Sequence, residues 1–155
     1  MPATPAHRTA TSADAEALRD LERAASTAAF GSIFPPELYP YPDAAVLARW
    51  ESTLEETAVT VLVTADEQGL TSLVAFDADR VRHLEVRPDC WRQGLARQAM
   101  RAAHLHSAPS RLWCLADNHG ALAFYATLGW RPTGRSRDGE FPPHPTEIEL
   151  AAFQD

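Results

Sequence analysis

Two strand-like segments separated by a helix-length stretch most constrain the fold of this chain. Residues 81 to 86 read VRHLEV and residues 111 to 116 read RLWCLA, and both are typical of strands. Between them, the sequence from Gly94 to about His106 favours a helix. A helix between two strands of one sheet implies a crossover connection, so we expect these two strands to pair in parallel.

The remaining segments need no crossover and can form antiparallel hairpins. A proline-rich loop with the sequence FGSIFPPELYPYPD separates the first two helices. Further strands are predicted at residues 7–11, 59–65, 70–76, 130–137 and 146–153, and further helices at about 12–26, 42–54 and 120–128. The pattern predicts a mixed α/β layer fold with a mostly antiparallel central sheet, one parallel pair and four main helices, and not a doubly wound fold.

Length and charge narrow the class of protein. At 155 residues we expect a single domain over residues 1–155, with a core that needs no disulfide or metal. The net charge is −7 and all 14 cationic residues are arginine, which argues against nucleic acid as a partner. No apolar run approaches the roughly 20 residues that span a membrane, and no signal-peptide pattern opens the chain. The two cysteines, Cys90 and Cys114, are too few for a disulfide framework, so we expect a reducing, cytoplasmic location. They also lack metal-ligand spacing with the histidines, so no metal is expected.

The first junction between a strand and a helix, RPDCWRQGLARQAM at residues 87 to 100, has the composition of an anion site. A turn containing Gly94 followed by a helix leaves several backbone N–H groups unpaired at the positive helix end. Arg92 and Arg97 add charge beside it. Every helix has such an end, so an ordinary helix start is the alternative interpretation.

The second junction, NHGALAFYATLGW at residues 118 to 130, predicts an amphipathic helix. Ala121, Phe124, Tyr125 and Leu128 follow each other at helical spacing and form one apolar face. Taken alone, this pattern favours Tyr125 as a core aromatic whose hydroxyl is hydrogen-bonded.

Together the two junctions resemble the GCN5-related N-acetyltransferase superfamily. The acetyl-CoA signature of that family, Q/R-x-x-G-x-G/A, is matched by Trp91-Arg92-Gln93-Gly94-Leu95-Ala96, with tryptophan in place of glutamine or arginine. The later family element, N-x-x-A-x-x-F-Y followed by G-F or G-W, is matched in full by Asn118, Ala121, Phe124, Tyr125, Gly129 and Trp130. The strand order and the separation of the two elements also fit, so the resemblance covers nearly the whole chain.

The resemblance implies acetyl-CoA as co-substrate, bound mainly by backbone groups. The pantetheine arm would lie in a splay between the segments that end at Val86 and Ala116, beside Asn118. A backbone N–H near Val86 would hold the thioester carbonyl as its oxygen becomes negative. The amides that would hold the pyrophosphate are those of Arg92, Gln93, Gly94, Leu95, Ala96 and Arg97.

The resemblance also implies that Tyr125 protonates the departing thiolate. A phenol with a pKa near 10 can protonate a thiolate whose conjugate acid has a pKa near 8.5. We therefore expect direct attack of the amine on the thioester. Cys90 precedes the positive helix end and is a rival nucleophile, but a packing cysteine is the alternative that the family pattern favours.

The strand at residues 81 to 86 contains the candidates for a base that takes a proton from the acceptor amine. Alternation predicts that Val81, His83 and Glu85 share one face. Glu85 is the first candidate for a base or a water-relay partner, and His83 is the second. A solvated strand face is the alternative, and many members of the family use ordered water instead.

The acceptor site of the family is built from the loop between the first two helices and from the C-terminal hairpin. In this chain these segments would supply an aromatic wall of Phe34, Tyr39, Tyr41 and Phe141, and acidic residues Glu37, Asp43 and Glu140 to attract a cation. The alternative is that these residues serve only packing and turns.

The expected function is acetyl transfer from acetyl-CoA to a primary amine of a small molecule, such as an amino acid, a polyamine or an amine antibiotic. The alternatives are acetylation of a protein or peptide amine, and a non-catalytic module that binds acyl-CoA as a sensor. No nucleic acid or membrane partner is expected, and a homodimer is possible because dimers are common in the family.

Overall fold

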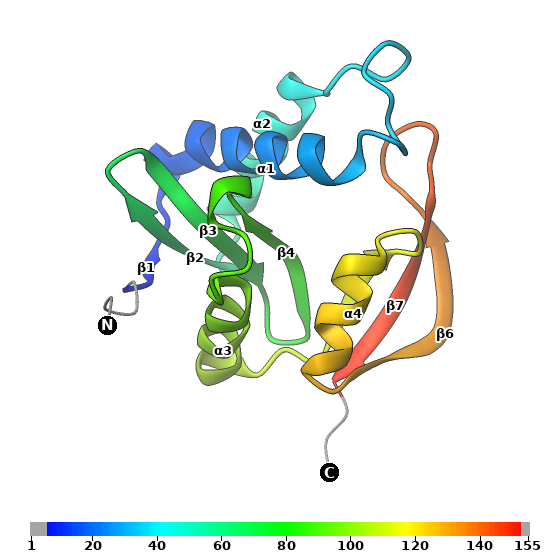
Figure 1. Ribbon diagram of the computed structural model, residues 1–155. Helices are drawn as coiled ribbons and strands as arrows, with labels where there is room; N and C mark the ends of the chain where they lie inside the picture. The colour runs from blue at the N-terminus through cyan, green and yellow to red at the C-terminus, as the bar shows by residue number, and fades with distance from the viewer. Residues whose placement is uncertain (1–5, 153–155) are drawn as a thin grey trace.

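A computed structural model describes residues 6–152 of the chain, and its order of elements confirms the predicted fold class (Figure 1). The helices are α1 (Ala15–Phe30), α2 (Asp43–Glu55), α3 (Leu95–Ser107) and α4 (His119–Thr127). The strands are β1 (Arg8–Thr9), β2 (Thr60–Asp66), β3 (Gly69–Phe76), β4 (Arg80–Val86), β5 (Arg111–Leu115), β6 (Trp130–Asp138) and β7 (Thr146–Ala152). Two 3-10 turns, η1 (Ser12–Asp14) and η2 (Pro88–Cys90), precede α1 and α3.

The seven strands form one sheet in the order β1-β2-β3-β4-β5-β7-β6. Every neighbouring pair is antiparallel except β4 and β5, which pair in parallel as the crossover predicts. The parallel pairing is limited to Arg80 with Arg111 and Val81 with Leu112. Beyond these residues the two halves of the sheet separate, and Figure 1 shows β4 and β7 diverging from this point.

Helices cover both faces of the sheet, so there are two apolar cores. One core joins α1 and α2 to β2 and β3 through fully buried residues that include Leu18, Trp50 and Leu73. The other joins α3 and α4 to the opposite face and includes Ala99 and Leu112. Burying one large apolar side chain contributes about 1.5–3 kcal/mol to the free energy of folding. Because each core buries several such side chains, the two cores fix the helices and strands on either side of the splay.

The prediction that Val81 shares a face with His83 and Glu85 is wrong. Strand β4 has a bulge where it pairs with β3. Ala75 of β3 pairs with His83, but the next residue of β3, Phe76, pairs with Val81. The extra residue is Arg82, which reverses the alternation. Val81 therefore packs with the α3 and α4 core, whereas His83 contacts Trp50 of α2 on the other face.

Small differences at element ends have local causes. Helix α1 continues to Phe30, one turn beyond the predicted end, because no glycine or proline interrupts the sequence before Gly31. Gly129 follows α4 with a φ of +86°, the left-handed conformation predicted for a helix-ending glycine. The last residue of the predicted final strand, Phe153, lies outside the described residues.

Candidate functional site

The separation of β4 from β5 opens a cleft with a volume of about 1900 Å³. Its walls come from the C-terminal half of α1, the loop before α2, the edges of β4 and β5, the start of α3, and α4. Most of the predicted acetyl-CoA and acceptor residues therefore line one continuous space, among them Val86 at the end of β4, and Asn118 and Tyr125 from the segment that follows β5.

The segment between β4 and α3 has the backbone shape of an anion cradle. Arg92 has a φ of +64° and Gly94 a φ of +85°, and such left-handed residues turn successive N–H groups toward one point. The bond from the Gln98 N–H to the Gly94 carbonyl, 3.0 Å long, is the first along α3, so the N–H groups before it have no helical acceptor. This geometry suits a phosphate group.

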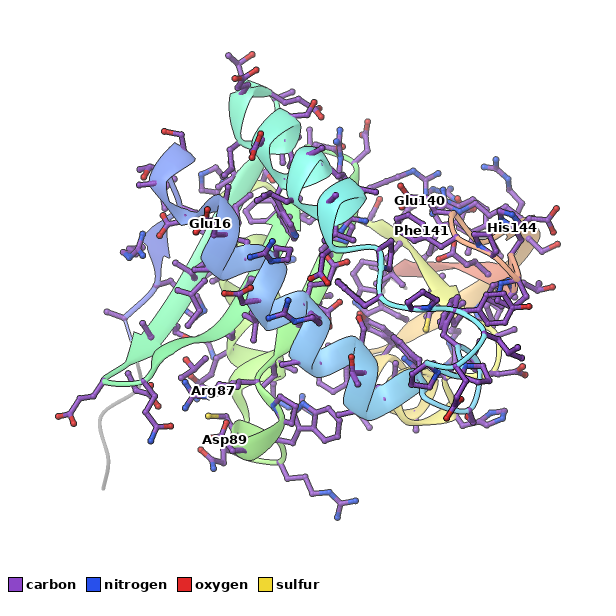
Figure 2. The ribbon with its side chains drawn as sticks, turned by 90° about the horizontal axis from the view of Figure 1, so that it is seen from above. Glu16, Arg87, Asp89, Glu140, Phe141 and His144 are labelled. Atoms are coloured by element: carbon purple, nitrogen blue, oxygen red, sulfur yellow. The ribbon has the colours of Figure 1, made fainter. Side chains whose placement is uncertain are left out.

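Side chains around this segment divide into two sets. Arg92, Leu95, Ala96 and Arg97 line the cleft together with Gly94. The Gln93 side chain instead approaches the Asp89 carbonyl at 3.5 Å. Figure 2 shows Arg87 and Asp89 together beside η2, where Arg87 pairs with Asp89 at 2.6 Å and so fixes the turn.

Trp91 ties the cradle to the end of β4. Its indole N–H donates a 2.7 Å hydrogen bond to the Val86 carbonyl, and the residue is 43% exposed and lines the cleft. The Arg87 N–H bonds to Thr71 of β3 at 2.9 Å, so the backbone groups of its neighbour Val86 point the other way, into the splay. Tryptophan thus supplies a side-chain donor at the position where the family signature has glutamine or arginine.

Cys90 has the properties of a packing residue. Its side chain is buried, and desolvation together with a hydrogen bond to Asp89 raises the pKa of the thiol above its usual value. A thiol that stays protonated is a poor nucleophile.

The N-cap residue of helix α4, Asn118, and the buried Tyr125 of this helix both line the cleft. Asn118 caps the helix, since its side-chain oxygen accepts a 3.1 Å bond from the Ala121 N–H. Tyr125 is 8% exposed and packs against Phe124 and Trp130, with ring centroids 5.3 and 6.3 Å away. Burial first, and then the charges of Cys114 and Glu85, raise the pKa of Tyr125, so its phenol remains protonated.

His83 and Glu85 share the face of β4 that α1 and α2 cover, and both line the cleft. Desolvation and repulsion by Glu22 raise the pKa of Glu85 well above its usual value, against an opposing effect of Arg49. Desolvation and nearby arginines lower the pKa of His83 to about 3, so this imidazole is uncharged at neutral pH. Glu85 therefore takes up a proton at a higher pH than an ordinary carboxyl does, whereas His83 stays uncharged.

Glu22 anchors a network that the sequence analysis missed. Its carboxylate is only 8% exposed, pairs with Arg49 and accepts a 3.0 Å bond from the Trp50 indole. Arg49 continues the network to Glu140 at 3.2 Å. The sequence did contain a signal for this buried carboxylate. Glu22 lies four residues after Leu18, on the apolar face of α1, and a carboxylate buried on such a face needs a charged or hydrogen-bonding partner.

The predicted acceptor wall is assembled in part. Phe34, Tyr39, Tyr41, Glu140 and Phe141 all line the cleft. Figure 2 shows Glu140 and Phe141 beside the chain that leads into α2.

Two of the predicted acidic residues are not brought to the cleft. Asp43 pairs with Arg23 at 2.6 Å, so its charge is already neutralised on the helix pair. Glu37 is exposed and does not line the cleft.

Within residues 6–152, no helix is long and apolar enough to cross a membrane. The same part of the chain contains no group of three histidine, cysteine, aspartate or glutamate residues placed to hold a metal ion.

Comparison with known proteins identifies relatives of this fold. The family model described as Acetyltransferase (GNAT) family matches residues 15–130. No curated protein matches the sequence. A GCN5-related N-acetyltransferase from Rhodopseudomonas palustris superposes with a TM-score of 0.79, at 16% identity, over 99% of this chain and 98% of the other.

Two further structures show the same fold with a named ligand or substrate. The PaiA N-acetyltransferase from Thermoplasma acidophilum, in complex with coenzyme A, gives a TM-score of 0.69 at 14% identity, covering 95% of this chain and 98% of the other. A chimera of the Vibrio cholerae spermidine N-acetyltransferase SpeG and hSSAT gives 0.65 at 14% identity, covering 97% and 96%.

Proposed function

Because the family model covers residues 15–130, the chain belongs to the acetyltransferase (GNAT) family, and we propose that it transfers an acetyl group directly from acetyl-CoA to a primary amine of a small molecule. The observation that supports this proposal is the cleft that opens between β4 and β5 and is lined by Val86, Asn118 and Tyr125. The relative that binds coenzyme A has the same fold, which supports this choice of co-substrate.

The backbone supplies most of the proposed binding to acetyl-CoA. The amides of residues 92 to 97 at the start of α3 receive the pyrophosphate, with Arg92 and Arg97 adding positive charge. The Val86 N–H faces the splay and donates to the thioester oxygen as negative charge develops on it. The side-chain amide of Asn118 reaches the pantetheine arm while its oxygen caps α4.

Tyr125 and Glu85 move the protons in this proposal. Tyr125 is the proposed proton donor to the sulfur that leaves, and its phenol is protonated at neutral pH. Because burial makes this phenol a weaker acid than an exposed one, it first holds the departing thiolate by a hydrogen bond, and transfer of its proton to the sulfur is completed as the tyrosine takes a proton from water. Glu85 accepts a proton from the acceptor amine, directly or through water, and its raised pKa makes it a stronger base than an exposed glutamate. His83, which has a pKa of about 3, is a wall of the acceptor site and not its base.

The proposal is tested by comparing Tyr125→Phe with Cys90→Ala in an assay of CoA release from acetyl-CoA with a pool of primary amines. Loss of a general acid typically costs about 10²- to 10⁴-fold in rate, so Tyr125→Phe should lower kcat by at least about a hundredfold. Cys90→Ala should leave kcat within about threefold, because its thiol has no role in direct transfer.

The reverse result, with Cys90→Ala inactive and Tyr125→Phe normal, would contradict direct transfer. A chain that binds acetyl-CoA in calorimetry but releases no CoA with any amine would instead be a sensor.

A further inference from the structure

The half of the cleft formed by β5, β6 and β7 contains a tryptophan surrounded by arginines. The guanidinium carbons of Arg137, Arg80 and Arg135 lie 4.5, 5.6 and 5.8 Å from the Trp113 ring centroid. All four residues line the cleft, and we call them the arginine floor. Since α1 and α2 cover only the β1 to β4 half of this face, the floor stays open to a ligand.

The arginine floor is more positive than its carboxylates can balance. Glu149, which is fully buried, accepts from Arg80 at 2.7 Å, Arg111 at 3.0 Å and Arg135 at 3.4 Å. Arg137 pairs with Glu147 at 2.8 Å. The three arginines of the floor and the adjacent Arg111 thus share only two carboxylates, those of Glu147 and Glu149. Because the net charge of the protein is −7, this surface concentrates positive charge in an otherwise acidic molecule.

One donor of the floor still needs a partner. Arg80 Nη1 is buried and forms no hydrogen bond with any residue in the described part of the chain. A buried donor without an acceptor is rare and calls for an explanation such as a ligand or water. The side chains of Arg137 and Arg135 are 51% and 65% exposed, so they can turn donors toward the same ligand.

Three other carboxylates that line the cleft, those of Glu22, Glu85 and Glu140, lie apart from the arginine floor. Glu22 and Glu140 are joined through Arg49, and Glu85 lies on β4 beside them. His83 lies between these carboxylates and the arginine floor. It shares a strand face with Glu85, about 7 Å away along the strand, and the positive charge of Arg137 contributes to lowering its pKa. A molecule lying along the cleft would meet carboxylates at the transfer site and arginines on the floor.

We propose that the acceptor is a primary amine that also carries an oxyanion, either a carboxylate or a phosphate, and that the arginine floor binds this oxyanion. The planar guanidinium forks match both groups in geometry. The proposal rests on the proposed N-acetyltransferase function. It separates this chain from an acetyltransferase for polyamines, whose second end is a cation that the floor would repel.

The test compares ligands that differ only at the far end. Aminoalkanoates of three, six and eight carbons are matched with alkylamines and with diamines of equal length, and an aminoalkylphosphonate series separates carboxylate from phosphate recognition. Binding is measured by calorimetry in the presence of CoA, and CoA release is measured with acetyl-CoA. At the best chain length, an oxyanion should improve affinity and kcat/KM at least about tenfold over the alkylamine, since a charge-assisted hydrogen bond contributes about 1.5–3 kcal/mol.

Arg137→Gln and Arg137→Glu probe the floor without touching the bonds that hold Glu149. The first should remove most of the gain from the oxyanion, and the second should reverse the preference toward the diamine. Arg101→Gln, on the outer surface of α3, makes the same charge change away from the cleft and should leave the preference intact.

The outcomes separate this inference from the proposed activity. A diamine or plain alkylamine used as well as the oxyanion series, or a preference that Arg137→Glu leaves unchanged, would overturn the anion site while acetyl transfer stands. Tight binding of an aminoalkanoate that Arg137→Gln abolishes, with no CoA release from any amine, would support the anion site and overturn the proposed activity. No binding of any oxyanion ligand would overturn the anion site alone.

Discussion

Trp91 shows how one residue can depart from a family signature while the backbone of its segment keeps the conformation of an anion cradle. Its indole N–H bonds to the Val86 carbonyl, which fixes the cradle on β4, while the backbone conformation that gathers the N–H groups is set by Arg92 and Gly94. The departure was visible in the sequence, but the bond was not, because it joins two residues whose relative placement depends on η2.

Replacing Trp91 therefore has a limited predicted effect on co-substrate binding. Trp91→Arg should change the Kd for acetyl-CoA by less than about tenfold, equal to about 1.4 kcal/mol, because in the proposed site backbone amides make most of the contacts with the pyrophosphate. Gly94→Val is the comparison, since a φ of +85° strains a β-branched residue and should distort the cradle. Calorimetric titration checks both variants, and a gain much larger than tenfold in Trp91→Arg would show that the family's polar side chain matters here.

The pH dependence of the reaction should report on Glu85. A base acts when deprotonated, and because its pKa is raised, activity should rise with pH through a value above the usual 4.5. Glu22→Gln removes a repelling charge, which lowers the pKa of Glu85 and moves the acid limb of kcat/KM to lower pH.

Glu85→Gln should lower kcat and flatten the acid limb of the kcat/KM profile. Tyr125 should not contribute to this limb, because its raised pKa keeps the phenol protonated at acid and neutral pH. A pH profile of kcat/KM for the three proteins checks this. An acid limb that stays in place in both variants would assign the base to another group or to water.

At the scale of elements, the C-terminal strands are held by one buried carboxylate. Glu149 on β7 bonds to Arg80 of β4, Arg111 of β5 and Arg135 of β6, so it joins strands from both sides of the splay. Hydrogen bonds from Arg80, and further charges, lower the pKa of Glu149 to about 2. A glutamate with a depressed pKa in the folded state stabilises the fold above its unfolded pKa and loses that effect as pH falls toward the folded value.

Glu149→Gln should accordingly lower the free energy of unfolding at pH 7, where the carboxylate is ionised. The difference from wild type should shrink as the pH falls from about 4.5 toward 2, because the native carboxylate then becomes protonated. Urea unfolding across this range measures the difference, with Glu147→Gln as an exposed-pair control. A difference that does not depend on pH would contradict the ion-pair account.

The elements themselves were largely predictable from the sequence. Proline and glycine positions, apolar periodicity and the crossover rule gave the helices, the strands and the parallel pair β4 and β5 close to their observed bounds. The bulge at Arg82 was not predictable, since it depends on how β4 meets β3, and it overturned the expected face of Val81.

At the scale of the whole molecule, the site follows from a sheet that splits. Residues from the α4 junction and from the start of α3 were predictable because their local motifs are continuous in sequence. The network of Glu22, Arg49 and Glu140 was not, because its members come from three distant segments that only the tertiary fold brings together. The arginine floor has the same origin, on the exposed face of β5 to β7.

Direct transfer of the acetyl group from acetyl-CoA to an amine requires that both substrates bind in one ternary complex. Initial rates of CoA release, measured over a grid of acetyl-CoA and amine concentrations, test it most directly. Direct transfer predicts reciprocal plots that intersect, with the acetylated amine as product. Parallel lines, with an acetyl group recovered on Cys90 in the absence of amine, would contradict it.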